Sequence, residues 1–223
     1  MQNFKMRWLV SAVLVAGSIG FFAGTGFSED PEPSEEEMMK MMMELGKPGP
    51  GHKAMEPMMG DFEVDSKMWM NDPEPIQSKA TSTSDWVLGG RYATIDYKGS
   101  FQGMDFHGRG VMAFDNFKKE YQSVWYDSFS TNILYMTGSA SDDGKTITFT
   151  GTWDGPMGAM KMKHVYQIVG PDTYTLTGYM ETPEGDQKHM ELTFNRRKAP
   201  AAAPAVRVNR RCCPKPTTKG PGY

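Results

Sequence analysis

Apolar and polar residues alternate in short runs from Gly60 to Arg197, and each run ends at residues that favour turns. Alternation with a period of two places every second side chain on the same face, which is typical of half-buried β-strands. The runs predict about ten strands with no helix between them. They span residues 62–70, 76–88, 92–101, 104–114, 121–128, 133–139, 145–153, 160–169, 173–180 and 187–195.

The links between these runs are short and favour tight turns. Asp142, Asp143 and Gly144 form a hairpin signal, because Gly144 can adopt the positive φ that such a turn needs. Sequential strands with tight links predict an antiparallel up-and-down sheet, which must curl or close to bury one face and protect its edges. About eight strands fill a barrel with side chains, so about ten leave room for a small ligand. We therefore expect an all-β barrel, with a two-sheet sandwich as the alternative.

Residues 29–59 precede the strands and predict an acidic linker followed by short helices. The stretch 35–45 (EEEMMKMMMEL) is typical of a helix. Ser34 is placed to cap this helix, and Glu37 completes a capping box. A second helical turn is expected over residues 52–59, directly before the first strand.

The chain begins with the pattern of an export signal. Lys5 and Arg7 precede an apolar run at 8–23, which is too short for a comfortable membrane span, and small residues follow up to Ser28. This order is typical of a secretory signal peptide, here residues 1–28. We expect a periplasmic or secreted protein without stable membrane insertion after cleavage, and an uncleaved membrane anchor is the alternative.

Residues 199–223 are rich in Ala and Pro and then basic, so they predict a flexible tail that buries too little apolar surface to fold. The last 28 residues hold eight Lys or Arg and no acid, which leaves 16 basic against 27 acidic residues in the rest of the chain. The part of the chain before residue 196 is acidic and lacks the basic surface that binding to nucleic acid requires. The basic tail is instead suited to contact anionic polymers of the cell envelope. The two cysteines, Cys212 and Cys213, lie in this tail and cannot cross-link the strands.

Several segments form an ordered series along the chain: 48–53 (PGPGHK), 60–62 (GDF), 67–70 (KMWM), 86–91 (WVLGGR), 106–110 (FHGRG), 114–116 (FDN), 125–128 (WYDS), 172–174 (DTY) and 191–194 (ELTF). Taken together they resemble DUF1579, a bacterial family of unknown function that is common in planctomycetes. The resemblance covers roughly residues 35–198 and implies a calycin-like β-barrel over 60–198, related in shape to lipocalins and fatty-acid-binding proteins. It implies no established activity or site.

The residues best suited to bind a ligand are aromatic or basic. We expect the barrel to bind a small hydrophobic or amphipathic molecule without catalysis, with tryptophans in apolar contact and arginines pairing with an anionic group. Arg109 shares its strand face with Asp105 and His107, so this polar row lies either in the lumen or in solvent. The expected lumen or mouth residues are Trp69, Trp86, Arg91, Arg109, Tyr121, Trp125 and Trp153.

Signals for catalysis are weak. The chain has no Gly-x-Ser-x-Gly motif, no cysteine among the strands and only scattered histidines. No cofactor is indicated, because a haem needs an axial histidine in an apolar pocket and His164, the one candidate, is better interpreted as a core or surface residue. Two alternatives stay open: an enzyme with acids and His107 at the barrel mouth, and a solid barrel with a structural role.

A copper site is the alternative from a different class. Met160, Met162 and His164 lie at i, i+2 and i+4 of a predicted strand, so two thioethers and an imidazole share one face. Thioethers and imidazole suit Cu(I). Successive residues on one face lie about 6.6 Å apart, so a single ion requires the side chains to bend together. We therefore rank copper binding in the cell envelope below ligand binding.

Overall fold

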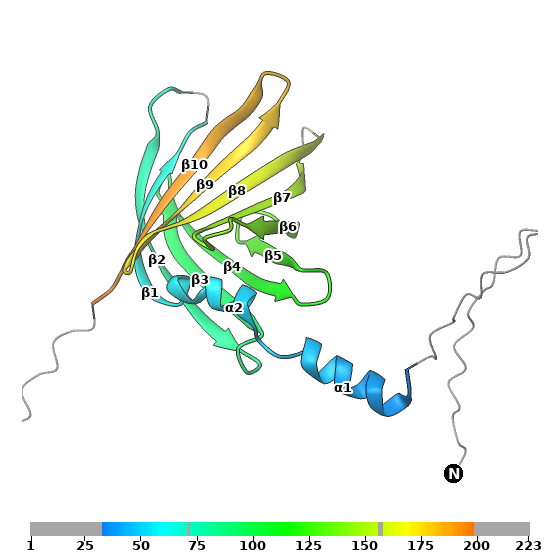
Figure 1. Ribbon diagram of the computed structural model, residues 1–223. Coiled ribbons are helices and arrows are strands. Elements are labelled where there is room, and N and C mark those ends of the chain that lie inside the picture. The colour runs from blue at the N-terminus through cyan, green and yellow to red at the C-terminus, as the bar shows by residue number, and fades with distance from the viewer. Residues whose placement is uncertain (1–32, 71, 156–157, 199–223) are drawn as a thin grey trace, which may run out of the picture.

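The computed structural model describes residues 33–70, 72–155 and 158–198, and its strands form one closed antiparallel barrel (Figure 1). Round the barrel the strands follow the order β1-β10-β9-β8-β7-β6-β5-β4-β3-β2. The closed ring confirms the predicted barrel and excludes the two-sheet sandwich. The strands are β1 (Gly60–Met68), β2 (Ile76–Val87), β3 (Tyr92–Phe101), β4 (Met104–Asp115), β5 (Glu120–Asp127), β6 (Leu134–Ala140), β7 (Thr146–Gly155), β8 (Gly158–Gly170), β9 (Thr173–Thr182) and β10 (Gly185–Arg196).

Strand β1 closes the barrel, because it pairs with β2 on one side and with β10 on the other. Phe62 lies opposite Ser82 of β2 and also opposite Arg196 of β10. Met68, at the other end of β1, lies opposite Met190 of β10. The hydrogen-bonded ladder therefore runs on from the last strand to the first.

The alternation that predicted the strands also decides which residues face the interior. On β1, Phe62 and Val64 are buried while Glu63 between them is exposed, and on β2 Ser82 and Ser84 are buried. Burial of the apolar row supplies the main free energy that holds the strands together. The buried interior cluster comprises Met55, Met58, Phe62, Val64, Ala80, Ala93, Tyr97, Met112, Tyr121, Leu134, Met136, Ile147, Phe149, Tyr174, Leu176, Leu192 and Phe194.

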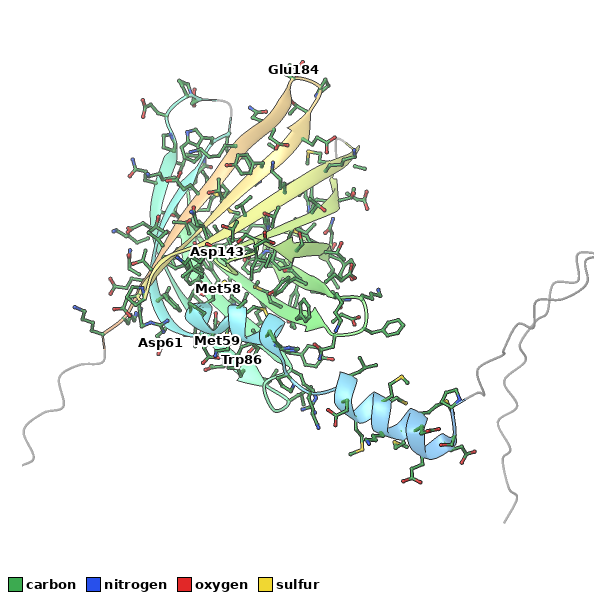
Figure 2. All side chains as sticks on the ribbon, viewed as in Figure 1. Met58, Met59, Asp61, Trp86, Asp143 and Glu184 are labelled. Carbon is green, nitrogen blue, oxygen red and sulfur yellow. The ribbon has the colours of Figure 1, made fainter. Side chains whose placement is uncertain are left out.

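Two short helices, α2 (Pro50–Ala54) and η1 (Glu56–Met58), lie across one end of the barrel, which we call the helical end (Figure 1). Figure 2 labels Met58 at this end and Glu184 in a turn at the opposite end. Met55 is 0% exposed and Met58 is 2% exposed, because both side chains join the interior cluster. The predicted second helical turn is thus present, and it closes this end with apolar side chains.

His52 fixes α2 to the barrel. The Gly49 backbone N–H donates a hydrogen bond of 3.1 Å to His52 Nδ1. The imidazole lies between Trp86 and Phe114, with ring centroids 6.5 and 6.1 Å away. The backbone of Gly51 approaches Phe114 so closely that a side chain there would overlap the ring.

Helix α1 (Glu35–Leu45) extends away from the barrel (Figure 1). The Glu37 N–H donates to Ser34 Oγ (3.3 Å), and the Ser34 N–H donates to Glu37 Oε2 (2.8 Å), which confirms the predicted capping box. The helix buries none of its residues. Its exposed methionines are Met38, Met39, Met41, Met42 and Met43.

Two predictions fall on residues outside those that the structure describes. They are the signal peptide at 1–28 and the basic tail at 199–223, which includes Cys212 and Cys213. Within the described ranges, no helix combines the length and the apolar character that a membrane crossing requires.

Candidate functional site

The half of the barrel interior next to the helical end is filled with side chains. Phe62 and Tyr174 meet edge to face with centroids 5.0 Å apart, and Tyr174 stacks on Phe194 at 4.2 Å. Tyr121 is buried against Phe114, with centroids 4.8 Å apart. Tyr121, one of the expected ligand-binding residues, therefore belongs to a packed core.

Beyond this core the interior retains accessible space. His164 and Tyr166 of β8 lie so deep that burial lowers the pKa of His164 to about 4 and raises the pKa of Tyr166, because loss of hydration disfavours the charged forms. Both residues nevertheless keep part of their accessible surface. A side chain that lies far inside the barrel and is still accessible to a sphere the size of a water molecule borders an internal space. We call the space bordered by His164 and Tyr166 the lumen.

One wall of the lumen is aromatic. The rings of Tyr97 and Trp125 meet edge to face with centroids 6.3 Å apart, and Phe106 packs on Tyr97 at 5.8 Å. The Trp125 indole N–H donates to Asp127 Oδ2 (3.0 Å), and the indole covers Gly108 of the adjacent strand. Tyr97, Phe106 and Trp125, on β3 to β5, form what we call the aromatic wall. Trp125 was expected among the ligand-binding residues.

A second wall carries imidazole and thioether groups. His164 of β8 lies opposite Gly178 of β9. A Cβ at Gly178 would lie 2.9 Å from His189 Nε2 and 3.0 Å from Met190 Cε, so these β10 side chains lean over the glycine. The next pair of β8 and β9 on the same face of the sheet is Met162 with Met180. This donor wall comprises Met162, His164, Met180, His189 and Met190.

The two walls face each other. In the ring of strands, β9 and β4 are separated by four strands in either direction. The donor wall on β8 to β10 therefore lies across the lumen from the aromatic wall on β3 to β5. A molecule between them meets aromatic rings on one side and nitrogen and sulfur atoms on the other.

His189 was not expected from the sequence, because a β-bulge alters the alternation between Lys188 and Met190. Lys188 faces outward, where its Nζ donates to Glu191 Oε2 (3.0 Å). His189 is the extra residue of the bulge, and its side chain lies against Gly178. His189 Nε2 is buried without a hydrogen-bond partner among the described residues, and burial lowers the pKa of this histidine. No local sequence signal marks the bulge.

Arg91 and Arg109, which were expected at the lumen or the mouth of the barrel, do not line the lumen. Arg91 lies in the turn after β2 and donates from Nη1 to the carbonyl of Leu88 (2.9 Å). Arg109 projects from the outer face, where Nε lies 3.3 Å from Asp96 Oδ2. The same carboxylate oxygen lies 3.1 Å from His107 Nε2. The apolar side chains of β4 face the interior, so His107 and Arg109, on the opposite face of the strand, point towards solvent.

The remaining tryptophans lie at the two ends of the barrel. Trp86 donates from Nε1 to Glu56 Oε2 (3.0 Å) and helps to close the helical end, so it does not line the lumen. Trp69 follows β1 at the opposite rim, where Lys188 Nζ lies 4.3 Å from its ring centroid. Trp153 pairs with Met160 close to the same rim. Trp69 therefore lies beside Lys188 on the outer side of this rim.

A surface depression of about 540 Å³ lies outside the barrel, beside the helical end. Arg196 lines it, but its guanidinium donates to the carbonyls of Met59 (2.6 Å) and Pro57 (2.8 Å) and lies 3.3 Å from Asp172 Oδ1. These contacts join β10 to η1. The arginine therefore serves to hold the helical end in place.

Comparisons with known proteins agree with this architecture. The family model described as protein of unknown function (DUF1579) matches residues 47–196. No curated protein matches the chain.

Two solved structures share the fold. The crystal structure of Rv2717c from M. tuberculosis has a TM-score of 0.52 and 14% sequence identity, over 68% of this chain and 100% of that one. The S-type phycobiliprotein lyase CPES from Guillardia theta has a TM-score of 0.50 and 11% identity, over 75% of this chain and 100% of that one. At such low identity the likeness shows the barrel fold alone.

Proposed function

The chain belongs to the DUF1579 family, whose function is unknown, and we propose that its barrel binds a small, partly apolar molecule in the lumen. The observation that carries this proposal is the accessible surface that His164 and Tyr166 retain deep inside a closed barrel. Apolar cavities with a few polar groups are the usual sites for small molecules. The helical end is closed, so the guest enters at the opposite rim.

The charge of the lumen favours a neutral guest over an anion. Arg91 and Arg109 face solvent, and the low pKa of His164 leaves its imidazole uncharged at pH 7. Tyr166 adds a neutral hydroxyl, because burial raises the pKa of this tyrosine. A guest with one or two hydrogen-bonding groups gains affinity by pairing with this hydroxyl and with the imidazole.

We assign the protein to binding rather than catalysis. The enzymatic alternative used His107 at the barrel mouth, and His107 lies on the outer face beside Asp96. The lyase name of one structural neighbour comes with 11% sequence identity and supports nothing beyond the shared fold.

A fluorescent probe tests the proposal. N-phenyl-1-naphthylamine, which is neutral, should bind at one site per chain and fluoresce more strongly, whereas its anionic sulfonate analogue should bind more weakly. Trp125→Ala removes a ring from the aromatic wall and should weaken probe binding about tenfold, the size of one lost aromatic contact. The measurement is a fluorescence titration, together with native mass spectrometry of the protein purified from its own cells.

Tyr126→Ala is the matched control, because Tyr126 is the next residue on β5 and is 44% exposed. This variant should bind the probe as the wild type does. Trp125→Phe, which keeps an apolar ring, should lose less affinity than Trp125→Ala. Equal binding by Trp125→Ala and the wild type, with near-UV circular dichroism showing both folded, contradicts a site at this wall.

We also propose export to the periplasm or secretion, on the evidence of the signal pattern at 1–28. The intact mass of the mature protein should show cleavage near Ser28. A full-length protein that remains in the membrane fraction would instead support the uncleaved anchor.

The basic segment 199–223 is proposed to contact anionic polymers of the envelope. Deletion of this segment should release the protein from envelope fractions at low salt. Unchanged association after the deletion would refute the contact.

A further inference from the structure

We propose that the imidazole and thioether side chains around Gly178 bind one Cu(I) ion inside the barrel. The donors are His164 of β8 and His189 and Met190 of β10, with Met162 and Met180 beside them. The site lies on the donor wall, across the lumen from the aromatic wall, and does not depend on the proposed organic guest.

The absence of a side chain at Gly178 makes the approach of the donors possible. His164 is the direct cross-strand neighbour of Gly178 on one side. On the other side, His189 Nε2 and Met190 Cε lie 2.9 and 3.0 Å from the position that a Cβ would take. Neighbouring strands are about 4.8 Å apart, so donors from β8 and β10 meet over the empty position on β9.

The buried nitrogen of His189 is the second observation that points to a ligand. His189 Nε2 is removed from solvent and pairs with no atom of the described residues. Polar atoms in protein interiors are nearly always paired, so an unpaired imidazole nitrogen beside a second imidazole calls for a partner.

The chemistry of the donor set selects the ion. A neutral imidazole offers a lone pair to a metal. The described residues contain no group of three or more His, Cys, Asp or Glu side chains suited to hold a metal. Thioether and imidazole without carboxylate favour Cu(I) over Zn²⁺ or Mg²⁺, and a single positive charge costs less to bury than two.

The structure also changes the copper ligands that the sequence indicated. Met160 pairs with Trp153 near the rim, two positions further along β8 than Met162. The side chains of His189 and Met190 reach to within about 3.0 Å of the position that a Cβ would take at Gly178, next to His164, whereas Met160 lies beyond Met162 on the side away from Gly178. His189 and Met190 therefore replace Met160 in the set.

The test is an anaerobic Cu(I) titration of the full chain in competition with bicinchoninate. Other sulfur donors must first be removed, so the starting protein carries Cys212→Ser, Cys213→Ser and leucine in place of the five exposed methionines of α1. This protein should bind one Cu(I) and should not bind Zn²⁺ at the same concentration. The X-ray absorption spectrum should show both nitrogen and sulfur ligands.

Three variants roughly keep side-chain size while removing the proposed ligands. His164→Gln and His189→Gln should each weaken Cu(I) binding at least 100-fold, and Met190→Leu should lower the sulfur contribution to the absorption spectrum. His107→Gln on the outer face is the matched control and should bind as the starting protein does. Thermal unfolding and circular dichroism confirm that each variant is folded.

Retained Cu(I) affinity in the combined variant His164→Gln/His189→Gln would overturn the proposed site. Absence of Cu(I) binding by the starting protein would do the same. Probe binding is measured on the same samples, so loss of the copper site with an intact probe site leaves the proposed function unaffected, and the reverse result leaves the copper site unaffected.

Discussion

The indole ring of Trp125 covers Gly108 of the neighbouring strand so closely that a side chain at Gly108 would overlap it. The same ring donates from Nε1 to Asp127 Oδ2, so it is held from two sides. Glycine at position 108 thus positions the aromatic wall of the lumen. The backbone at Gly108 is ordinary extended strand, so the requirement is for space and not for an unusual φ.

Gly108→Ala is therefore expected to destabilise the barrel by about 2 kcal/mol, because the added methyl group displaces the indole. The measurement is urea unfolding of the wild type and the variant. In a Trp125→Ala background the same substitution should cost less than about 0.5 kcal/mol, since the overlap is gone. Equal costs in the two backgrounds would show that the backbone, and not the indole, requires glycine at this position.

The helical end should contribute strongly to stability. Met55 of the segment between α2 and η1 is 0% exposed within the interior cluster. Met55→Ala should cost about 3 kcal/mol, the typical effect of an unfilled cavity in a core. Met39→Ala on the exposed α1 should change the free energy of unfolding by less than about 0.5 kcal/mol. Similar effects of the two variants would contradict a closing role for α2 and η1.

Much of the fold follows from local signals, because alternation and turn residues act over a few neighbours. The capping box of Ser34 and Glu37 and the tight turn at Gly144, which has a φ of 67°, are examples. The side of the sheet that faces inward is a global property. Along β4 one row is polar and one apolar, so the placement of Arg109 was open until the closed barrel decided it.

The candidate site was harder to predict, because it depends on contacts between distant strands. His189 enters the lumen only through a β-bulge, and bulges have no reliable local pattern. The alternation along β2 places Trp86 on the inward face, as expected of a lumen residue. Its indole N–H donates to Glu56 instead, so Trp86 helps to close the helical end. Residue type alone does not distinguish these roles.

Arg109 should be dispensable for both stability and ligand binding. Its side chain is 57% exposed and pairs with Asp96 on the outer face. Exposed ion pairs contribute little to stability, so Arg109→Ala should change the free energy of unfolding by less than about 1 kcal/mol. Titration with N-phenyl-1-naphthylamine should give the wild-type affinity. A large loss of probe affinity would mean that Arg109 lines the lumen, and would contradict its placement on the outer face of β4.

The stability of the metal-free barrel should depend on the protonation of His164. Burial lowers the pKa of His164 from the ordinary 6.5 to about 4 in the folded protein. Between these values the unfolded chain binds a proton that the folded chain does not bind, so acid favours unfolding. The stability is fully present above pH 6.5 and is lost as the pH falls towards 4, by about 3 kcal/mol for this group.

His164→Gln removes the titrating group and keeps a polar side chain of similar length. Urea unfolding in the presence of a chelator should therefore show that the wild type loses about 3 kcal/mol more than this variant between pH 7.5 and pH 4. His189 is present in both proteins, so any pH dependence that remains in the variant includes its contribution. Parallel stability curves for the wild type and His164→Gln would mean that His164 is hydrated in the folded barrel. The lumen would then be open to bulk water at the level of His164, and a site for a guest that is protected from water would be ruled out at this level.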